Sequence, residues 1–96
     1  MSWSHVEALT VAALQAALRS RKRLPPIPEA GRPAWAAFEA LNSTRAWADG
    51  HPAPITFAEI EAWTRLQPLP PHPQTIEIVR AMDRAFRTWA AERRAK

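Results

Sequence analysis

Hydrophobic residues recur every three or four positions in four stretches of the chain, which is the spacing of one face of an α-helix. The clearest stretch is Pro54–Leu66, PITFAEIEAWTRL. Its apolar positions fall on one face of the predicted helix: Phe57, Ile60, Trp63 and Leu66. Thr56 and Glu59 are spaced so that each side chain can accept a hydrogen bond from the backbone N–H of the other. Such a capping box predicts that a helix starts here, and we expect it to end at Gln67.

Three further stretches predict helices. The first runs from about Ser4, as N-cap, to Lys22, the second from about Pro33 to Ala48, and the fourth from about Pro73 to Arg94. The ten prolines of the chain lie mainly between these stretches, and proline interrupts helices. Asp49-Gly50 marks a turn after the second helix. Because strand-like alternation is absent, we expect no sheet.

These elements predict an all-α fold: a small bundle of three helices in residues 33–96, joined by proline-rich connectors, and an N-terminal amphipathic helix with its connector in residues 1–32. We favour packing of the first helix on the rest of the chain, and pairing with a copy or a partner is the alternative. Leu69, in the last connector, is expected to tuck beneath it. The expected core comprises Trp35, Phe38, Leu41, Ile55, Ile60, Trp63, Leu66, Val79, Met82, Phe86 and Trp89. Candidate protein-binding residues are Trp3, Leu9, Leu14, Leu18 and Trp47.

Asp83 lies on the apolar face of the fourth helix, and a carboxylate in that place needs a partner. The candidate partners from elsewhere in the chain are Arg45 and the indole N–H groups of Trp47 and Trp63. A local ion pair with Arg80 or Arg87, about one helical turn away, is the alternative. The sequence does not choose between the two.

The net charge of +4 comes mainly from two basic clusters, Arg19–Arg23 and Arg93–Lys96. Such clusters suit nucleic acid or an acidic partner, but basic residues also complement the dipole at helix C-termini, and we favour this second interpretation. A helix-turn-helix is disfavoured because the connector Pro68–His72 has three prolines and no glycine. The start of the next helix, Pro73–Glu77, also lacks Arg and Lys.

No combination of residues indicates catalysis or a bound cofactor. The chain has no cysteine, which excludes thiolate zinc sites and thiol catalysis, and its three histidines lie in three separate segments. With two glycines in the chain, no phosphate-binding loop is expected. The longest apolar run is too short for a membrane span. We therefore expect no enzyme activity, cofactor, metal, small-molecule substrate or membrane contact.

Four motifs occur in order along residues 33–92. They are Trp35–Phe38 in the second helix, the segment PITFAEIEAWTRL, the prolyl connector Pro68–Pro73, and Met82–Phe86, MDRAF. In this order they resemble a family of small tailed-bacteriophage proteins encoded among the tail genes and often labelled tail assembly chaperones. The third-helix segment carries most of this resemblance. The N-terminal helix lies outside it.

The resemblance implies a non-enzymatic helper that binds tail proteins during assembly, either the tape-measure protein or the tube subunit, in the cytoplasm of the infected host. The five tryptophans of the chain agree with this, because Trp and Arg are favoured anchors of interfaces. We expect Trp3 to be more exposed than Trp35 and Trp63. The alternatives are a small nucleic-acid-binding or regulatory phage protein, including an inhibitor of a host defence system, and a self-associating structural component.

Overall fold

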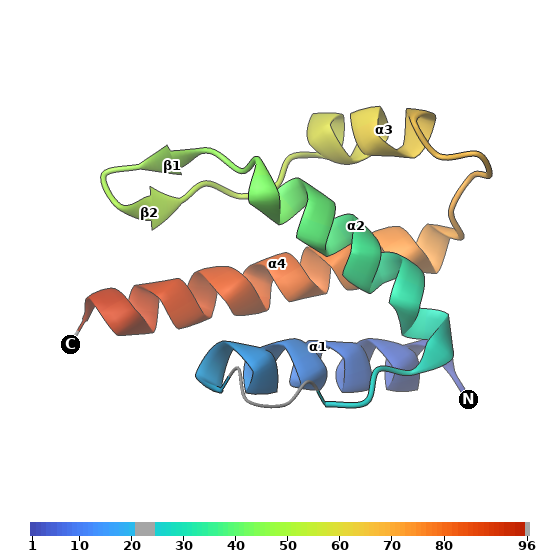
Figure 1. Cartoon of the computed structure of the whole chain (residues 1–96), viewed down its shortest axis with the longest axis horizontal. Helices are drawn as coiled ribbons and strands as arrows, with labels where there is room; N and C mark the ends of the chain where they lie inside the picture. Colours follow the sequence, from blue (N-terminus) through green and yellow to red (C-terminus); the bar gives the residue numbers. More distant parts are fainter. Residues whose placement is uncertain (21–24, 96) are drawn as a thin grey trace.

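The computed structural model describes residues 1–20 and 25–95. The helices are α1 (Trp3–Arg19), α2 (Arg32–Ser43), α3 (Phe57–Arg65) and α4 (Pro73–Arg94), and a short 3-10 turn, η1 (Glu29–Gly31), precedes α2. Two short strands, β1 (Trp47–Ala48) and β2 (His51–Pro52), form an antiparallel hairpin after α2. The described part of the chain is therefore mostly helical, with one small sheet (Figure 1).

The helix α4 is the central element, and it has the predicted bounds. Pro73 stands in its first turn, where a backbone N–H is not needed, and the His72 side chain accepts a hydrogen bond from the Gln74 N–H at 3.0 Å. Both α1 and α2 pack on α4, and α3 packs on α2. Figure 1 shows the resulting order in space, in which α1, α4, α2 and α3 follow one another.

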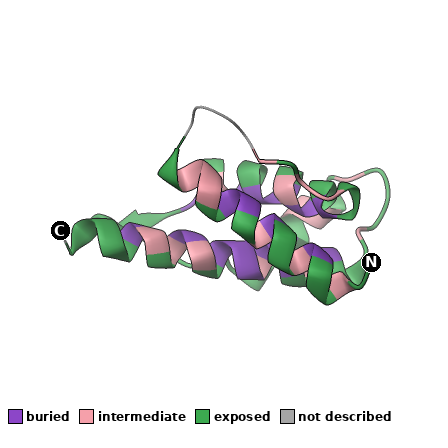
Figure 2. Cartoon of the chain, turned by 90° about the horizontal axis from the view of Figure 1, so that it is seen from below, coloured by how far each residue is buried: buried purple, intermediate pink, exposed green. Residues whose placement is uncertain are grey.

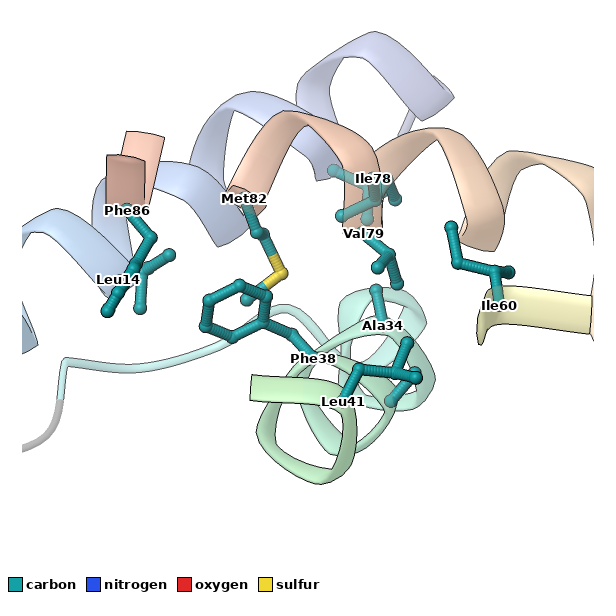
Figure 3. Close-up of a cluster of buried hydrophobic side chains, with 11 residues drawn as sticks. Leu14, Ala34, Phe38, Leu41, Ile60, Ile78, Val79, Met82 and Phe86 are labelled. Atoms are coloured by element: carbon teal, nitrogen blue, oxygen red, sulfur yellow. The ribbon is translucent and has the colours of Figure 1, made fainter. Parts of the chain in front are cut away.

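One cluster of buried apolar side chains joins these helices (Figure 3). Its members are Val6, Leu14, Ala34, Ala37, Phe38, Leu41, Ile60, Ile78, Val79, Met82 and Phe86. Most of them come from α2 and α4, whereas α3 supplies Ile60 alone. Since α1 contributes Val6 and Leu14, it docks on the rest of the chain, as we favoured from its sequence. Figure 2 shows the buried positions on the faces that the helices turn toward one another.

Gly31 allows the connector to lie tightly against α1. A Cβ atom at this position would collide with the Thr10 hydroxyl, which is itself fully buried. The Thr10 Oγ1 donates a hydrogen bond to the Val6 carbonyl at 2.7 Å, so the hydroxyl is satisfied within its own helix. The missing side chain at Gly31 therefore lets η1 and α1 meet without displacing a buried polar group.

The start of the first helix differs from the prediction. Ser2, rather than Ser4, is the N-cap, and its hydroxyl accepts a hydrogen bond from the His5 N–H at 3.2 Å. Starting the helix at Trp3 brings this indole against the core cluster, which favours the earlier cap. The predicted end at Lys22 lies outside the described residues.

The predicted absence of a sheet was wrong, and so was the end of the second helix at Ala48. The helix α2 ends at Ser43, and the chain then forms the hairpin. Asp49 and Gly50 both have positive φ, 53° and 79°, as a two-residue type I′ turn requires. An Asp-Gly pair is a favoured sequence for that turn, so the signal for the hairpin was present in the sequence.

The predicted capping box is present at the start of α3. The Thr56 N–H donates to Glu59 Oε1 at 3.0 Å, and the Glu59 N–H donates to Thr56 Oγ1 at 3.1 Å. The helix ends at Arg65 instead of Gln67, with Leu66 as its C-cap. Pro68 follows two residues after this cap, and a proline there prevents the helix from continuing.

Candidate functional site

A buried ion pair links α4 to the segment between α2 and the hairpin. A further hydrogen bond extends this link to the residues just before α3. Arg45 Nη1 lies 2.7 Å from Asp83 Oδ1, and both side chains are almost fully buried. Asp83 Oδ2 accepts hydrogen bonds from Arg87 Nε at 3.1 Å and from the Ile55 N–H at 3.2 Å. Asp83 therefore pairs with Arg45, a candidate from elsewhere in the chain, and also with Arg87, a local candidate on the same helix. The result is that a carboxylate on α4 anchors the residue before the Thr56 cap.

Arg45 makes further contacts that fix it in place. Its Nη1 donates to the Ala53 carbonyl at 2.8 Å and its Nε to Asn42 Oδ1 at 2.7 Å, while the guanidinium carbon lies 4.6 Å from the centre of the Phe86 ring. Its Nη2 is buried without a hydrogen-bond acceptor in the described ranges 1–20 and 25–95. The contact with Asp83 Oδ1 is short but not aligned as a hydrogen bond. Arg45 therefore acts as a structural charge that crosses from the end of α2 to α4.

An apolar surface covers the outer side of α2, α3 and the connector to α4. We call it the Trp63 surface, because two recesses meet at this indole, with volumes of about 340 Å³ and about 230 Å³. The larger recess is lined by Ala40, Leu41, Thr44, Glu59, Ala62, Trp63 and Leu66, and the smaller by Pro33, Ala36, Trp63, Gln67, Pro68, Leu69 and Pro71. Leu66 is 83% exposed and Leu69 is 77% exposed. These two leucines stand at the recesses and point into solvent.

Two predictions about this region are corrected by the structure. Leu66 was expected in the core and Leu69 beneath the connector, yet both are among the most exposed apolar side chains described. Leu66 lies six residues after Ile60, which places it about 120° away around the axis of α3, so its side chain does not follow Ile60 toward the core. The connector bends at residues 67–69, and it leaves the Leu69 side chain in water. The spacing of apolar residues predicted an apolar face of the third helix, but it did not predict which part of that face the other helices cover.

The other residues predicted to form the core lie as follows. Phe38, Leu41, Ile60, Val79, Met82 and Phe86 are buried in the cluster, and Trp35, Ile55, Trp63 and Trp89 are partly buried against it. Trp3 also packs against this cluster and stacks on the His72 ring, with 4.6 Å between ring centres. Trp3, Trp35 and Trp63 are all partly buried, so the structure does not set Trp3 apart, although we had expected it to be more exposed than the other two.

The five candidate protein-binding residues do not form one surface. Leu14 is 6% exposed and belongs to the core, so its assignment to a binding surface was wrong. Leu18 is partly buried against the same core. Leu9 is moderately exposed on α1, while Trp47 is exposed on β1 and touches Phe86 edge-on. The first helix uses its apolar stripe internally, which leaves less of it for a partner.

The part of the chain that the structure describes has neither a cluster of metal ligands nor a membrane-spanning helix. Within residues 1–20 and 25–95, no three His, Asp or Glu side chains come together as metal ligands would. No helix in the part of the chain that the structure describes has the length and apolar character needed to cross a bilayer.

The sequence resembles a known protein family over most of its length. A family model described as phage tail assembly chaperone matches residues 12–88. The match begins within α1, so the family relationship extends further toward the N-terminus than the segment 33–92 on which the resemblance was based. No curated protein and no solved structure matches the chain. Because the family model covers most of the sequence, the chain belongs to the phage tail assembly chaperone family.

Proposed function

We propose that this protein binds an apolar segment of a tail protein, the tape-measure protein or the tube subunit, through the Trp63 surface during tail assembly. It acts without catalysis, in the cytoplasm of the infected host. Membership of the phage tail assembly chaperone family supports a role in tail assembly. The surface itself supports the mode of binding, because it offers apolar side chains that the chain leaves in water.

The observation that carries the proposal is the exposure of Leu66 and Leu69 beside recesses that share Trp63. Covering a fully exposed leucine contributes about 1.5–3 kcal/mol. An indole between two recesses is also a favoured centre of an interface, since large rigid side chains lose little conformational entropy on binding. Apolar side chains of a partner that entered both recesses would enclose Trp63 from two sides.

The polar residues around this surface have the pattern of an interface rim. Glu59 lines the larger recess, and its carboxylate already accepts the Thr56 N–H. Gln67 lines the smaller recess, and its Nε2 donates a hydrogen bond to the Trp63 carbonyl at 3.3 Å. An apolar centre with polar groups at its edge is the usual anatomy of a protein interface.

The test compares two leucine variants in binding to the purified tape-measure protein and tube subunit of the same phage. The double variant Leu66→Ser/Leu69→Ser removes the apolar side chains of the Trp63 surface. The matched control, Leu9→Ser, removes an exposed leucine from α1, which lies on the opposite side of α4 from α3 (Figure 1). Calorimetric titration should show that the double variant weakens binding roughly tenfold or more, whereas the control retains the wild-type Kd.

Two outcomes would overturn the proposal. The first is a wild-type protein that binds neither tail protein. The second is the reverse ranking, in which Leu9→Ser weakens binding and the double variant does not, because this result would assign the contact to α1. Circular dichroism should show unchanged helix content in both variants, since the replaced side chains are exposed.

A further inference from the structure

A third recess lies on a different face from the Trp63 surface, between α4 and the segment that leads into α3. Its volume is about 380 Å³. One wall is the stretch Pro54–Phe57, and the other is the row Arg80, Asp83, Arg84 and Arg87 on α4. The three arginines stand at i, i+4 and i+7, so they share one face of the helix. The Trp63 surface uses none of these residues.

The recess carries more positive than negative charge. Its carboxylate, Asp83, is neutralised by Arg45 and Arg87. Arg80 has only a long contact to Glu77, with 3.4 Å between Nη1 and Oε1. Among the described residues Arg84 has no carboxylate within ion-pair distance, and it is exposed. The positive charge does not come from the N-terminus of α3, because the capping box of Thr56 and Glu59 already occupies it.

An aromatic side chain holds one of the arginines in position. The Arg80 guanidinium carbon lies 4.6 Å from the centre of the Phe57 ring, which orients the charged group by a cation–π contact. The ring remains 64% exposed, so its edge and outer face are available to an apolar side chain. The recess therefore presents the hydrogen-bond donors of arginine guanidinium groups beside an exposed aromatic ring.

We propose that this recess binds an acidic segment of another polypeptide. A carboxylate of the segment pairs with Arg84 and Arg80, whose planar forks match its two oxygens, and a neighbouring apolar side chain covers Phe57. A nucleic acid fits less well, because its backbone is held by several successive phosphate contacts, whereas Arg87 is already paired with Asp83 and only Arg80 and Arg84 remain in the recess. This inference does not depend on the proposed function, since it concerns another face and needs no tail protein for its test.

The test uses a synthetic peptide of alternating glutamate and leucine, its twin with glutamine in place of glutamate, and a thymidine oligonucleotide of the same length. Each is titrated into the full-length protein labelled with nitrogen-15. We expect the acidic peptide to shift the Phe57 amide and Arg84 Nε signals. The glutamine twin should bind at least about tenfold more weakly, because the ion pairs are lost.

Two charge-matched variants complete the test. Arg84→Gln should weaken binding of the acidic peptide about tenfold, whereas Arg65→Gln, which removes an exposed arginine outside the recess, should leave it unchanged. Equal binding of the glutamine twin, equal effects of the two variants, or no shift at Phe57 would each overturn the proposal. Shifts at the same signals caused only by the oligonucleotide would overturn it in favour of a nucleic-acid site.

Discussion

The helices α4 and α3 are both amphipathic in sequence, but the fold uses them differently. Residues along most of α4 are buried, from Thr75 to Ala90, against α1 on one side and α2 on the other. The helix α3 buries Ile60 alone and exposes Phe57 and the adjoining Leu66. In a small protein, apolar positions on the central helix serve stability, whereas those on a peripheral helix are free to meet a partner.

The two regions also differ in how they are fixed. The helix α4 is held by a continuous apolar core, while α3 is held by the single buried side chain of Ile60 and, at its beginning, by backbone and charge contacts. Asp83 accepts the Ile55 N–H, and the capping box of Thr56 and Glu59 starts the helix directly after it. These contacts position α3 without covering its sides. The comparison predicts that perturbations should separate global stability from the local order of α3.

The largest expected effect concerns the buried ion pair. Arg45→Met leaves Asp83 buried without its main partner, and breaking such a pair costs about 3–5 kcal/mol of unfolding free energy. Arg87→Gln, which removes the more exposed partner, should cost less than about 1 kcal/mol. Urea denaturation followed by circular dichroism measures both. If the two variants lost equal stability, Arg45 would not be the residue that compensates Asp83.

The next effect concerns the one core residue of α3. Ile60→Ala should cost about 2–4 kcal/mol, because it removes a buried side chain and leaves a cavity. Amide hydrogen exchange should show a loss of protection confined mainly to α3, with α4 remaining protected. A uniform loss of protection over both helices would contradict the view that α3 is attached through this contact.

A smaller effect is expected at the cap. Thr56→Ala removes the acceptor of the Glu59 N–H and should destabilise the protein by about 1 kcal/mol. Thr56→Ser retains the hydroxyl, so it should remain close to the wild type in thermal unfolding. The same loss in both variants would indicate that the methyl group of Thr56, and not its hydrogen bond, matters.

The smallest effect on stability is expected at the exposed Leu66 of the Trp63 surface. Leu66→Ser should change the free energy of unfolding by no more than about 0.5 kcal/mol, since the side chain is almost fully in water. Chemical denaturation can measure this difference. A loss comparable with that of Ile60→Ala would show that Leu66 is part of the core after all.

Local signals in the sequence predicted much of the helical structure. The capping box of Thr56 and Glu59 and the bounds of α4 depend on residue types at fixed spacing. Arg45 was one candidate partner of the buried Asp83, but the sequence did not choose it over a local ion pair. The hairpin was missed although Asp49-Gly50 favours it, because a strand of two residues is too short to show alternation. In a hairpin this short, the residues of the turn determine the structure, and the pattern of the strands does not.

The candidate binding surface could not be located from sequence alone. Leu14 and Leu66 occupy equivalent places on amphipathic stripes, yet the first is buried and the second exposed. The difference arises because α1 lies along α4, whereas α3 ends before Leu66 and packs on α2 through few side chains. Which stripe is covered depends on the packing order of the helices, and the pattern of one helix does not contain this information.

The central claim is that a tail protein is bound at the surface formed by α3 and its connector. Hydrogen exchange measured by mass spectrometry, on the chain alone and in its complex with the tail protein, tests this claim directly. The account predicts slower exchange in residues 60–71 and little change in residues 3–19. Slower exchange in residues 3–19, with residues 60–71 unchanged, would contradict it.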